Sequence, residues 1–351
     1  MAKRMKSKIQ PAVQTFVFTG KAIDQDEDIT YFIDLSQCAS LMNRRFYRQG
    51  LNWAVSNIKI RTRTAGLPVH CEIQSQKLPN TWVMSNAWEK GFRAWQKMNK
   101  EALIETPSVK PKFLDYKIFA NELHHAAGFA ANLLPVDSAG NEASPGEWAS
   151  AKMVIPDSDD TLGPGTVKEL EIIAVGDNYP PAGASNLRAV SLIQGYANSR
   201  GLPNVLDPNT PDDADDTSGP FPQNWINATF NEGTQQSEIV LDDLTSENNL
   251  APYPFENDGV NGDTMYPGGA NNLSALQIHD EMSLTGTTIG GVVHMQGGNF
   301  PCGLMGFRFN NFLVFDPVTG NPYEQEIYWD IQIDLVPGTH RGYLAEPMTE
   351  M

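Results

Sequence analysis

Residues 303–337 decide the fold: they read GLMGFRFNNFLVF (303–315), DPVTGNPYEQ (316–325) and EIYWDIQIDLVP (326–337). In the last segment apolar residues alternate with mostly polar ones from residue 327 to residue 335. The apolar set is Ile327, Trp329, Ile331, Ile333 and Leu335, and the alternating set is Tyr328, Asp330, Gln332 and Asp334. Alternation with a period of two is typical of a strand that is buried on one face. We therefore predict two long strands joined by a turn, a hairpin within a large antiparallel β protein.

The rest of this stretch adds two details to the hairpin. Asn310 and Asn311 interrupt the apolar alternation of the first strand, which predicts a β-bulge or a change of burial at that point. Asp316-Pro317 and the run 320–322 (GNP) supply turn residues between the strands.

The composition is that of a globular chain. Its 351 residues are 40% hydrophobic, enough for a sizeable core, and its 29 glycines and 24 prolines suit many turns and long loops. The basic N-terminus is followed by no apolar stretch of signal-peptide length, so we expect a cytosol-like compartment. Cys38, Cys71 and Cys302 are widely spaced, which predicts buried free thiols rather than disulfides or a zinc site.

The net charge of −17 is divided unevenly along the chain. Residues 135–285 contain 24 acidic and four basic residues, a net charge of −20. Residues 1–117 contain 19 basic and ten acidic residues, a net charge of +9. This segregation suggests two surfaces with different environments, although acidic loops also arise simply because they keep a protein soluble.

Basic residues of the first third are candidates for binding nucleic acid. Residues 1–12 form a short basic arm, and a second group lies in and before the expected strand 53–63 (WAVSNIKIRTR). The candidates are Lys3, Arg4, Lys6, Lys8, Arg44, Arg45, Arg48, Lys59, Arg61 and Arg63. Each cation could neutralise a phosphate, with affinity that falls as salt rises. Solubilising charges on a solvated strand face would give the same pattern.

No catalytic motif is present. The sequence has no GxSxG, HExxH, Walker or GxGxxG motif, and His124-His125 would point to opposite faces of a strand. The loop around Asp258 and Asp263 could bind calcium, but turn chemistry explains its residues as well. We expect no enzyme activity and no cofactor other than this possible calcium ion.

The basic arm MAKRMKSK, the strand WAVSNIKIRTR, the long Gly/Asp/Asn loops and the closing IYWDIQIDLVPGTHRGYL together resemble the coat proteins of small circular single-stranded DNA viruses. The resemblance implies an all-β fold: an antiparallel jelly-roll sandwich of eight strands, with long loop insertions and one or two short helices. It implies one domain over residues 13–351, with the acidic, loop-rich elaboration inside 135–285. Many such coats carry a long arginine-rich arm, whereas this arm has four basic residues, so the cluster at 44–63 would share its role.

The same resemblance implies a structural capsid protein. Many copies would assemble into an icosahedral shell around the viral nucleic acid, in the virion, without a membrane, and loops would meet a host-cell receptor. For contacts between subunits we select Asp330, Gln332, Asp334, Arg341 and Tyr343. Two alternatives stay open: a β-sandwich glycan-binding module or surface fibre, and a carbohydrate-active enzyme on the same fold.

Overall fold

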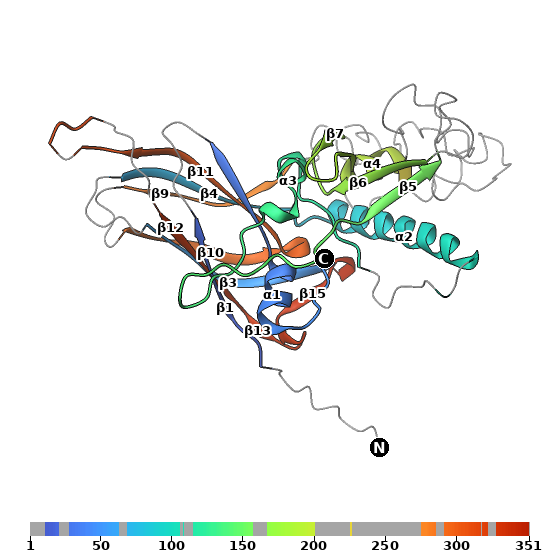
Figure 1. Cartoon of the computed structure of the whole chain (residues 1–351), viewed down its shortest axis with the longest axis horizontal. Helices are drawn as coiled ribbons and strands as arrows, with labels where there is room; N and C mark the ends of the chain where they lie inside the picture. Colours follow the sequence, from blue (N-terminus) through green and yellow to red (C-terminus); the bar gives the residue numbers. More distant parts are fainter. Residues whose placement is uncertain are drawn as a thin grey trace, which may run out of the picture. The chain divides into compact units, whose positions relative to one another are not determined.

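The computed structural model describes residues 11–20, 28–62, 69–105, 108, 115–156, 167–200, 225–226, 275–285, 291–316, 318–321 and 328–350. It is mostly β-strands in antiparallel sheets, with a few helices (Figure 1). The chain divides into two compact units. Unit 1 comprises Met1–Asn80, Phe129–Trp148 and Gln277–Met351, and unit 2 comprises Thr81–Gly128 and Ala149–Leu276. The second unit thus begins at Thr81, well before the composition changes at residue 135, and residues 135–148 belong to unit 1.

Unit 1 contains two antiparallel sheets. Sheet A has the order β1-β12-β3-β10, with β15 also paired to β3, and sheet B has the order β2-β11-β4-β9. The strands of sheet A are β1 (Thr15–Gly20), β3 (Leu51–Thr62), β10 (Val292–Phe300), β12 (Trp329–Leu335) and β15 (Ala345–Pro347). The strands of sheet B are β2 (Ile29–Asp34), β4 (Val69–Lys77), β9 (Gln277–Leu284) and β11 (Leu304–Val314).

The strands β11 and β12 do not form the predicted hairpin. β11 pairs with β2 and β4 in sheet B, whereas β12 pairs with β1 and β3 in sheet A. The hairpin prediction was wrong because alternation reports which face of a strand is buried, not which strand lies beside it. The predicted faces are correct: Trp329, Ile331 and Ile333 are fully buried in the core of unit 1. A register shift between Asn310 and Leu313 confirms the predicted bulge.

Short elements complete unit 1. They are α1 (Leu35–Asn43), the 3-10 turns η2 (Phe129–Ala131), η5 (Pro301–Gly303) and η6 (Met348–Glu350), and the small pair β13 (Pro337–Gly338) and β14 (Gly342–Tyr343). The three cysteines are free and buried, as expected.

The edges of both sheets are covered locally. The segment Phe129–Trp148 reaches sheet B through Leu133, whose N–H donates to the Phe32 carbonyl at 2.9 Å. It reaches sheet A through Val136, whose N–H donates to the Val17 carbonyl at 2.8 Å. At the other edge of sheet A, the Gln296 N–H donates to Asp280 Oδ2 at 2.8 Å, and His279 Nε2 lies 2.9 Å from the Gln296 carbonyl. Two side chains of β9 therefore satisfy the backbone of β10 at that position.

Unit 2 has a core of its own. Its four-stranded sheet has the order β5-β6-β8-β7, and β6 and β8 run parallel. Its elements are α2 (Trp82–Glu105), α3 (Glu122–Ala127), β5 (Lys152–Pro156), β6 (Val167–Ile173), β7 (Tyr179–Ala182), β8 (Leu187–Ser191) and α4 (Leu192–Arg200). Trp88, Phe92 and Trp95 of α2 pack around the ring of Tyr116 and so join the helix to this core. Within the described part of the chain, no helix is long and apolar enough to cross a membrane.

Candidate nucleic-acid interface

The structure separates the predicted basic cluster into two groups. Lys3, Arg4, Lys6, Lys8 and Arg63 lie outside the described residues. Arg44, Arg45 and Arg48 precede the first residue of β3, whereas Lys59 and Arg61 lie near its end. Residues 51 and 61 of β3 are ten steps apart, roughly 33 Å at about 3.3 Å per residue, so the two groups lie toward opposite ends of this strand. The density of basic residues in the sequence therefore does not correspond to one patch in space.

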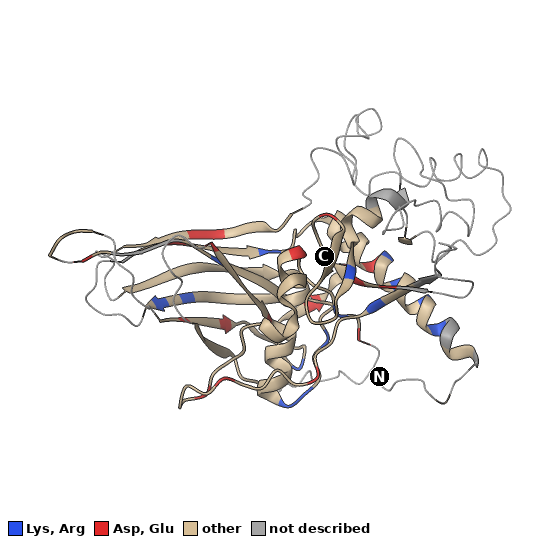
Figure 2. Cartoon of the chain, turned by 45° about the horizontal axis from the view of Figure 1, so that its top comes forward, with Lys and Arg blue, Asp and Glu red and all other residues tan. Residues whose placement is uncertain are grey.

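The group on β3 is electrostatically compensated. Arg61 Nη2 lies 2.7 Å from Asp330 Oδ2 on the adjacent strand β12, and the Asp330 side chain is only 6% exposed. Lys59 pairs in register with Gln332, the residue between Asp330 and Asp334. Figure 2 shows basic and acidic residues on neighbouring strands of unit 1. Two cations thus face two carboxylates, which leaves this sheet surface little net attraction for phosphate.

The carboxylate of Asp334 is held ionised by its own unit. Burial acts to raise the pKa of Asp334, but hydrogen bonds from Thr15, Gln332 and Asn57, with the charge of Lys59, outweigh it and lower the pKa. The predicted contact residues Asp330, Gln332 and Asp334 are therefore engaged with neighbouring strands of the same chain. Tyr343, another predicted contact, is fully buried, so its side chain is not exposed to a second subunit.

The second group gains an arginine from the C-terminal part of the chain. An Arg341 guanidinium N–H donates to the Phe46 carbonyl, and the Tyr47 hydroxyl donates to the Arg341 carbonyl at 3.0 Å. Arg341 thus lies against the segment that carries Arg44 and Arg45. We call Arg44, Arg45 and Arg341 the arginine collar. Sequence spacing gives no hint of this contact, because nearly 300 residues separate its two sides.

The collar surrounds the point at which the N-terminal chain enters the described structure. Arg45 Nη1 donates to the Pro11 carbonyl at 3.2 Å. Two residues on, the Val13 N–H donates to Asn43 Oδ1 at 3.0 Å, and the Tyr343 hydroxyl donates to the Val13 carbonyl at 2.5 Å. The basic arm of residues 1–10 is therefore joined to the chain directly beside the collar.

Two collar residues have strained backbones. Arg44, the C-cap of α1, has φ 53°, and Arg341 has φ 51°, both in the left-handed region. This conformation costs a residue with a side chain roughly 1–2 kcal/mol, which is why glycine is the usual choice. Strain of this kind concentrates at functional sites, where a particular side chain is needed despite the cost.

Among the residues that the structure describes, Arg44, Arg48 and Arg341 have exposed side chains and no ion-pair partner. Burial, followed by the positive charge of Arg341, lowers the pKa of the neighbouring His340. Both observations indicate a locally positive surface, in contrast to the compensated face of β3.

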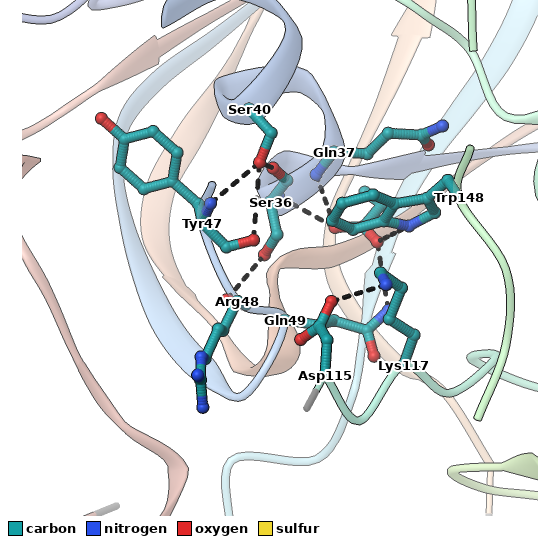
Figure 3. Close-up of polar contacts among 10 residues, drawn as sticks. Ser36, Gln37, Ser40, Tyr47, Arg48, Gln49, Asp115, Lys117 and Trp148 are labelled. Atoms are coloured by element: carbon teal, nitrogen blue, oxygen red, sulfur yellow. Dashed lines mark hydrogen bonds and ion pairs between the residues drawn. The ribbon is translucent and has the colours of Figure 1, made fainter. Parts of the chain in front are cut away.

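Hydrogen bonds fold the arginine-bearing segment back onto α1 (Figure 3). The Tyr47 N–H donates to Ser40 Oγ at 3.0 Å, and the Ser40 hydroxyl donates to the Ser36 carbonyl at 2.7 Å. The Ser36 hydroxyl in turn donates to the Arg48 carbonyl at 3.3 Å. With its polar backbone groups bound to the helix, the segment directs Arg44, Arg45 and Arg48 outward.

A buried carboxylate anchors both ends of this segment. Asp34 caps α1 by accepting from the backbone N–H groups of Ser36 (2.8 Å) and Gln37 (3.3 Å). Its second oxygen accepts from Gln49 Nε2 at 3.1 Å and from Trp148 Nε1 at 3.0 Å. Complete burial raises the pKa of Asp34 to about 6, although these four hydrogen bonds act to lower it. One side chain thus joins the start of α1 to Gln49, two residues before β3, on either side of the arginine-bearing segment.

Unit 2 contains a separate buried polar cluster, centred on Glu171 of β6. Its carboxylate accepts from Ser150 Oγ (2.5 Å) and Ser185 Oγ (2.7 Å) and lies 2.8 Å from His125 Nε2. His125 lies on the short helix α3 rather than on a strand, which corrects the expected geometry, and both it and His124 are fully buried. Both serines donate to the carboxylate and not to the imidazole, so the cluster lacks the serine–histidine contact of a nucleophilic site.

The possible calcium ligands Asp258 and Asp263 lie outside the described residues. Within the described ranges, no three His, Cys, Asp or Glu side chains are arranged to hold a metal ion. Comparison with protein-family models, with characterised proteins and with solved structures finds no match to this chain.

Proposed function

We propose that this chain is a capsid protein of the jelly-roll type, which assembles with copies of itself into an icosahedral shell around a nucleic-acid genome. The observation that carries the proposal is the strand order of unit 1. In chain order its eight long strands are β1, β2, β3, β4, β9, β10, β11 and β12. The first pairs with the eighth, the second with the seventh, the third with the sixth and the fourth with the fifth.

These pairings have a simple geometric meaning. They are the pairings of one long antiparallel ribbon, and rolling such a ribbon into two packed sheets produces the jelly roll. The two sheet orders, first-eighth-third-sixth and second-seventh-fourth-fifth, agree with this construction. Jelly rolls are frequent in viral shells, but the same fold also serves lectins and enzymes. The fold alone therefore supports a protein of the jelly-roll class, and the shell function has to be tested by an assembly experiment.

The arginine collar supports the second half of the proposal. A shell that encloses nucleic acid needs cations that are free to meet phosphate groups. Arg44, Arg48 and Arg341 are exposed and lack acidic partners within the described structure, and the basic arm joins the chain beside them. Both segments of unit 2 lie in the connection between the fourth and fifth strands, where insertions leave a sandwich core intact.

Assembly is the direct test. The purified full-length chain is examined by sedimentation velocity and negative-stain electron microscopy, with and without single-stranded DNA, over a range of salt and pH. We expect closed particles of uniform diameter. A chain that stays monomeric at high concentration under all of these conditions contradicts the proposal.

A glycan array run with and without a calcium chelator addresses the alternative of a binding module. Calcium-dependent binding to the array by a chain that does not assemble would replace the shell proposal with the glycan-binding one.

A further inference from the structure

We propose that the arginine collar of Arg44, Arg45 and Arg341 is a discrete phosphate-binding site, in which backbone carbonyls occupy the ligand positions when no phosphate is present. The inference rests on the proposed function for the source of the phosphate, a nucleic-acid backbone. It goes further by locating the site, by adding a C-terminal arginine to it and by excluding Lys59 and Arg61 from it.

The first argument concerns the present partners of the guanidinium groups. Arg45 donates to the Pro11 carbonyl and Arg341 to the Phe46 carbonyl. These two acceptors are neutral oxygens, Arg45 has at least one further interaction, and both arginines are exposed. A hydrogen bond from a guanidinium to an anionic oxygen is roughly twice as strong as one to a neutral acceptor. A phosphate oxygen therefore replaces these carbonyls with a gain in binding energy.

The second argument concerns geometry. The collar residues come from two parts of the chain, and the Tyr47 hydroxyl bonded to the Arg341 carbonyl fixes one part against the other. Tyr47 itself is fully buried, so this link is anchored in the core. Arginine forks on a fixed backbone suit the several oxygens of a phosphate group better than a flexible lysine patch.

The third argument concerns the backbone cost. Left-handed φ values at Arg44 and Arg341 are strained for any residue with a Cβ, and glycine would remove the strain. A side chain retained at both positions in one collar indicates a use for the two guanidinium groups.

Binding strength as a function of salt tests the inference. The probes are a fluorescent 20-nucleotide oligothymidine and inorganic pyrophosphate, measured on the full-length chain. The collar variant is R45Q/R341Q. The matched control is K100Q/K152Q, which removes the same two charges from exposed positions in unit 2.

The two variants have different expected outcomes. For the collar variant, the slope of log affinity against log salt for the oligonucleotide falls by about 1.4, at roughly 0.7 for each lost phosphate contact on a single strand. Its affinity near 0.1 M salt falls about tenfold, whereas the control changes less than twofold. Equal slopes and affinities in the collar and control variants overturn the inference.

A further variant, R44G, guards against misfolding as the cause of lost binding. It removes one guanidinium while relieving backbone strain, so the chain folds at least as well, and the salt slope still falls by about 0.7. An unchanged slope in R44G excludes Arg44 from the site and contradicts the proposal in this form.

Pyrophosphate separates the two sources of phosphate. Pyrophosphate binding that is lost in the collar variant assigns the site to phosphate groups in general. A collar effect on the oligonucleotide without pyrophosphate binding assigns the site to the polynucleotide backbone. Shell formation is measured separately. If the chain forms particles but the collar variant binds like the control variant, this inference alone is refuted. If the collar variant loses binding but the chain forms no particles, the shell proposal alone is refuted.

Discussion

Asp34 is a fully buried carboxylate, and it makes unit 1 more stable at low pH than at high pH, the reverse of the usual effect of a carboxylate. Its pKa rises from the ordinary 3.8 to about 6 in the folded chain. A difference of about two units, at about 1.4 kcal/mol per unit, corresponds to about 3 kcal/mol. Because the folded-state pKa is the higher one, the folded chain binds the proton more tightly. The stabilisation is therefore complete below pH 3.8 and is lost as the pH rises through 6.

The perturbation that isolates this term is D34N. The asparagine carbonyl can still cap α1 through Ser36 and Gln37, but its NH₂ group meets the donors Gln49 Nε2 and Trp148 Nε1. The loss of these two hydrogen bonds lowers the free energy of unfolding of the variant by about 1–3 kcal/mol, and this contribution does not change with pH.

Urea unfolding of both chains, followed by tryptophan fluorescence between pH 4.5 and pH 7, measures the effect. The free energy of unfolding of the wild type minus that of D34N should fall by about 2 kcal/mol over this interval, the part of the 3 kcal/mol not already lost by pH 4.5. Lowered pKa values at Glu171 and Asp334 act in the opposite direction, but they are common to both chains and cancel in the difference. A difference that stays constant or grows with pH would refute the reasoning.

Three further changes have defined outcomes. R44G should raise the free energy of unfolding by about 0.5–1 kcal/mol, because relief of the left-handed strain exceeds the entropy cost of glycine; a lower value in urea unfolding would contradict it. G20A should lower the free energy of unfolding by about 1–3 kcal/mol, since its Cβ would lie 1.9 Å from Trp329, and an unchanged urea midpoint would contradict this. E171Q should lower the free energy of unfolding at pH 7 by about 1–3 kcal/mol, because the glutamine NH₂ group would face side chains that now donate hydrogen bonds to the Glu171 carboxylate, His125 among them. Thermal unfolding checks this. No loss of stability would show that the cluster tolerates a neutral side chain.

Sequence patterns predicted the burial of single strands better than their pairing. The alternation around Trp329 identified the core face of β12, and Asn310 marked the bulge, because both depend on neighbouring residues alone. The partner of β12 depends on contacts hundreds of residues away, as Thr15 opposite Asp334 illustrates. Residues 316–328 connect β11 in sheet B to β12 in sheet A, but the same turn residues also occur in hairpins, so they do not show which of the two connections is present.

The candidate site was predictable to the same extent. Arg44, Arg45 and Arg48 were correctly singled out as basic and are exposed, but their difference from Lys59 and Arg61 was not visible in the sequence. That difference arises from acids on β12, which reach β3 only in the folded sheet. The addition of Arg341 has the same origin. Whether the exposed arginines bind nucleic acid stays a prediction.

The change in composition along the chain does not coincide with the boundary between the two compact units. The acidic, loop-rich texture begins at residue 135, yet residues 135–148 pack within unit 1, and unit 2 begins at Thr81 with the well-formed helix α2. Glycine, proline and acidic residues report exposure to water, and exposed loops occur in both units. A boundary between compact units depends instead on which apolar faces meet.

The covered position on β10 limits how copies of this protein can join. An incoming strand at Gln296 would have to displace the Asp280 carboxylate and the His279 ring before it could form its first backbone hydrogen bond. The contacts of Phe129–Trp148 at Val17 and Phe32 present a similar obstacle at the opposite edges. At these positions, growth by continuous sheet extension, the route to fibres, is obstructed. Any association at these positions would have to use side chains and loops rather than strand pairing.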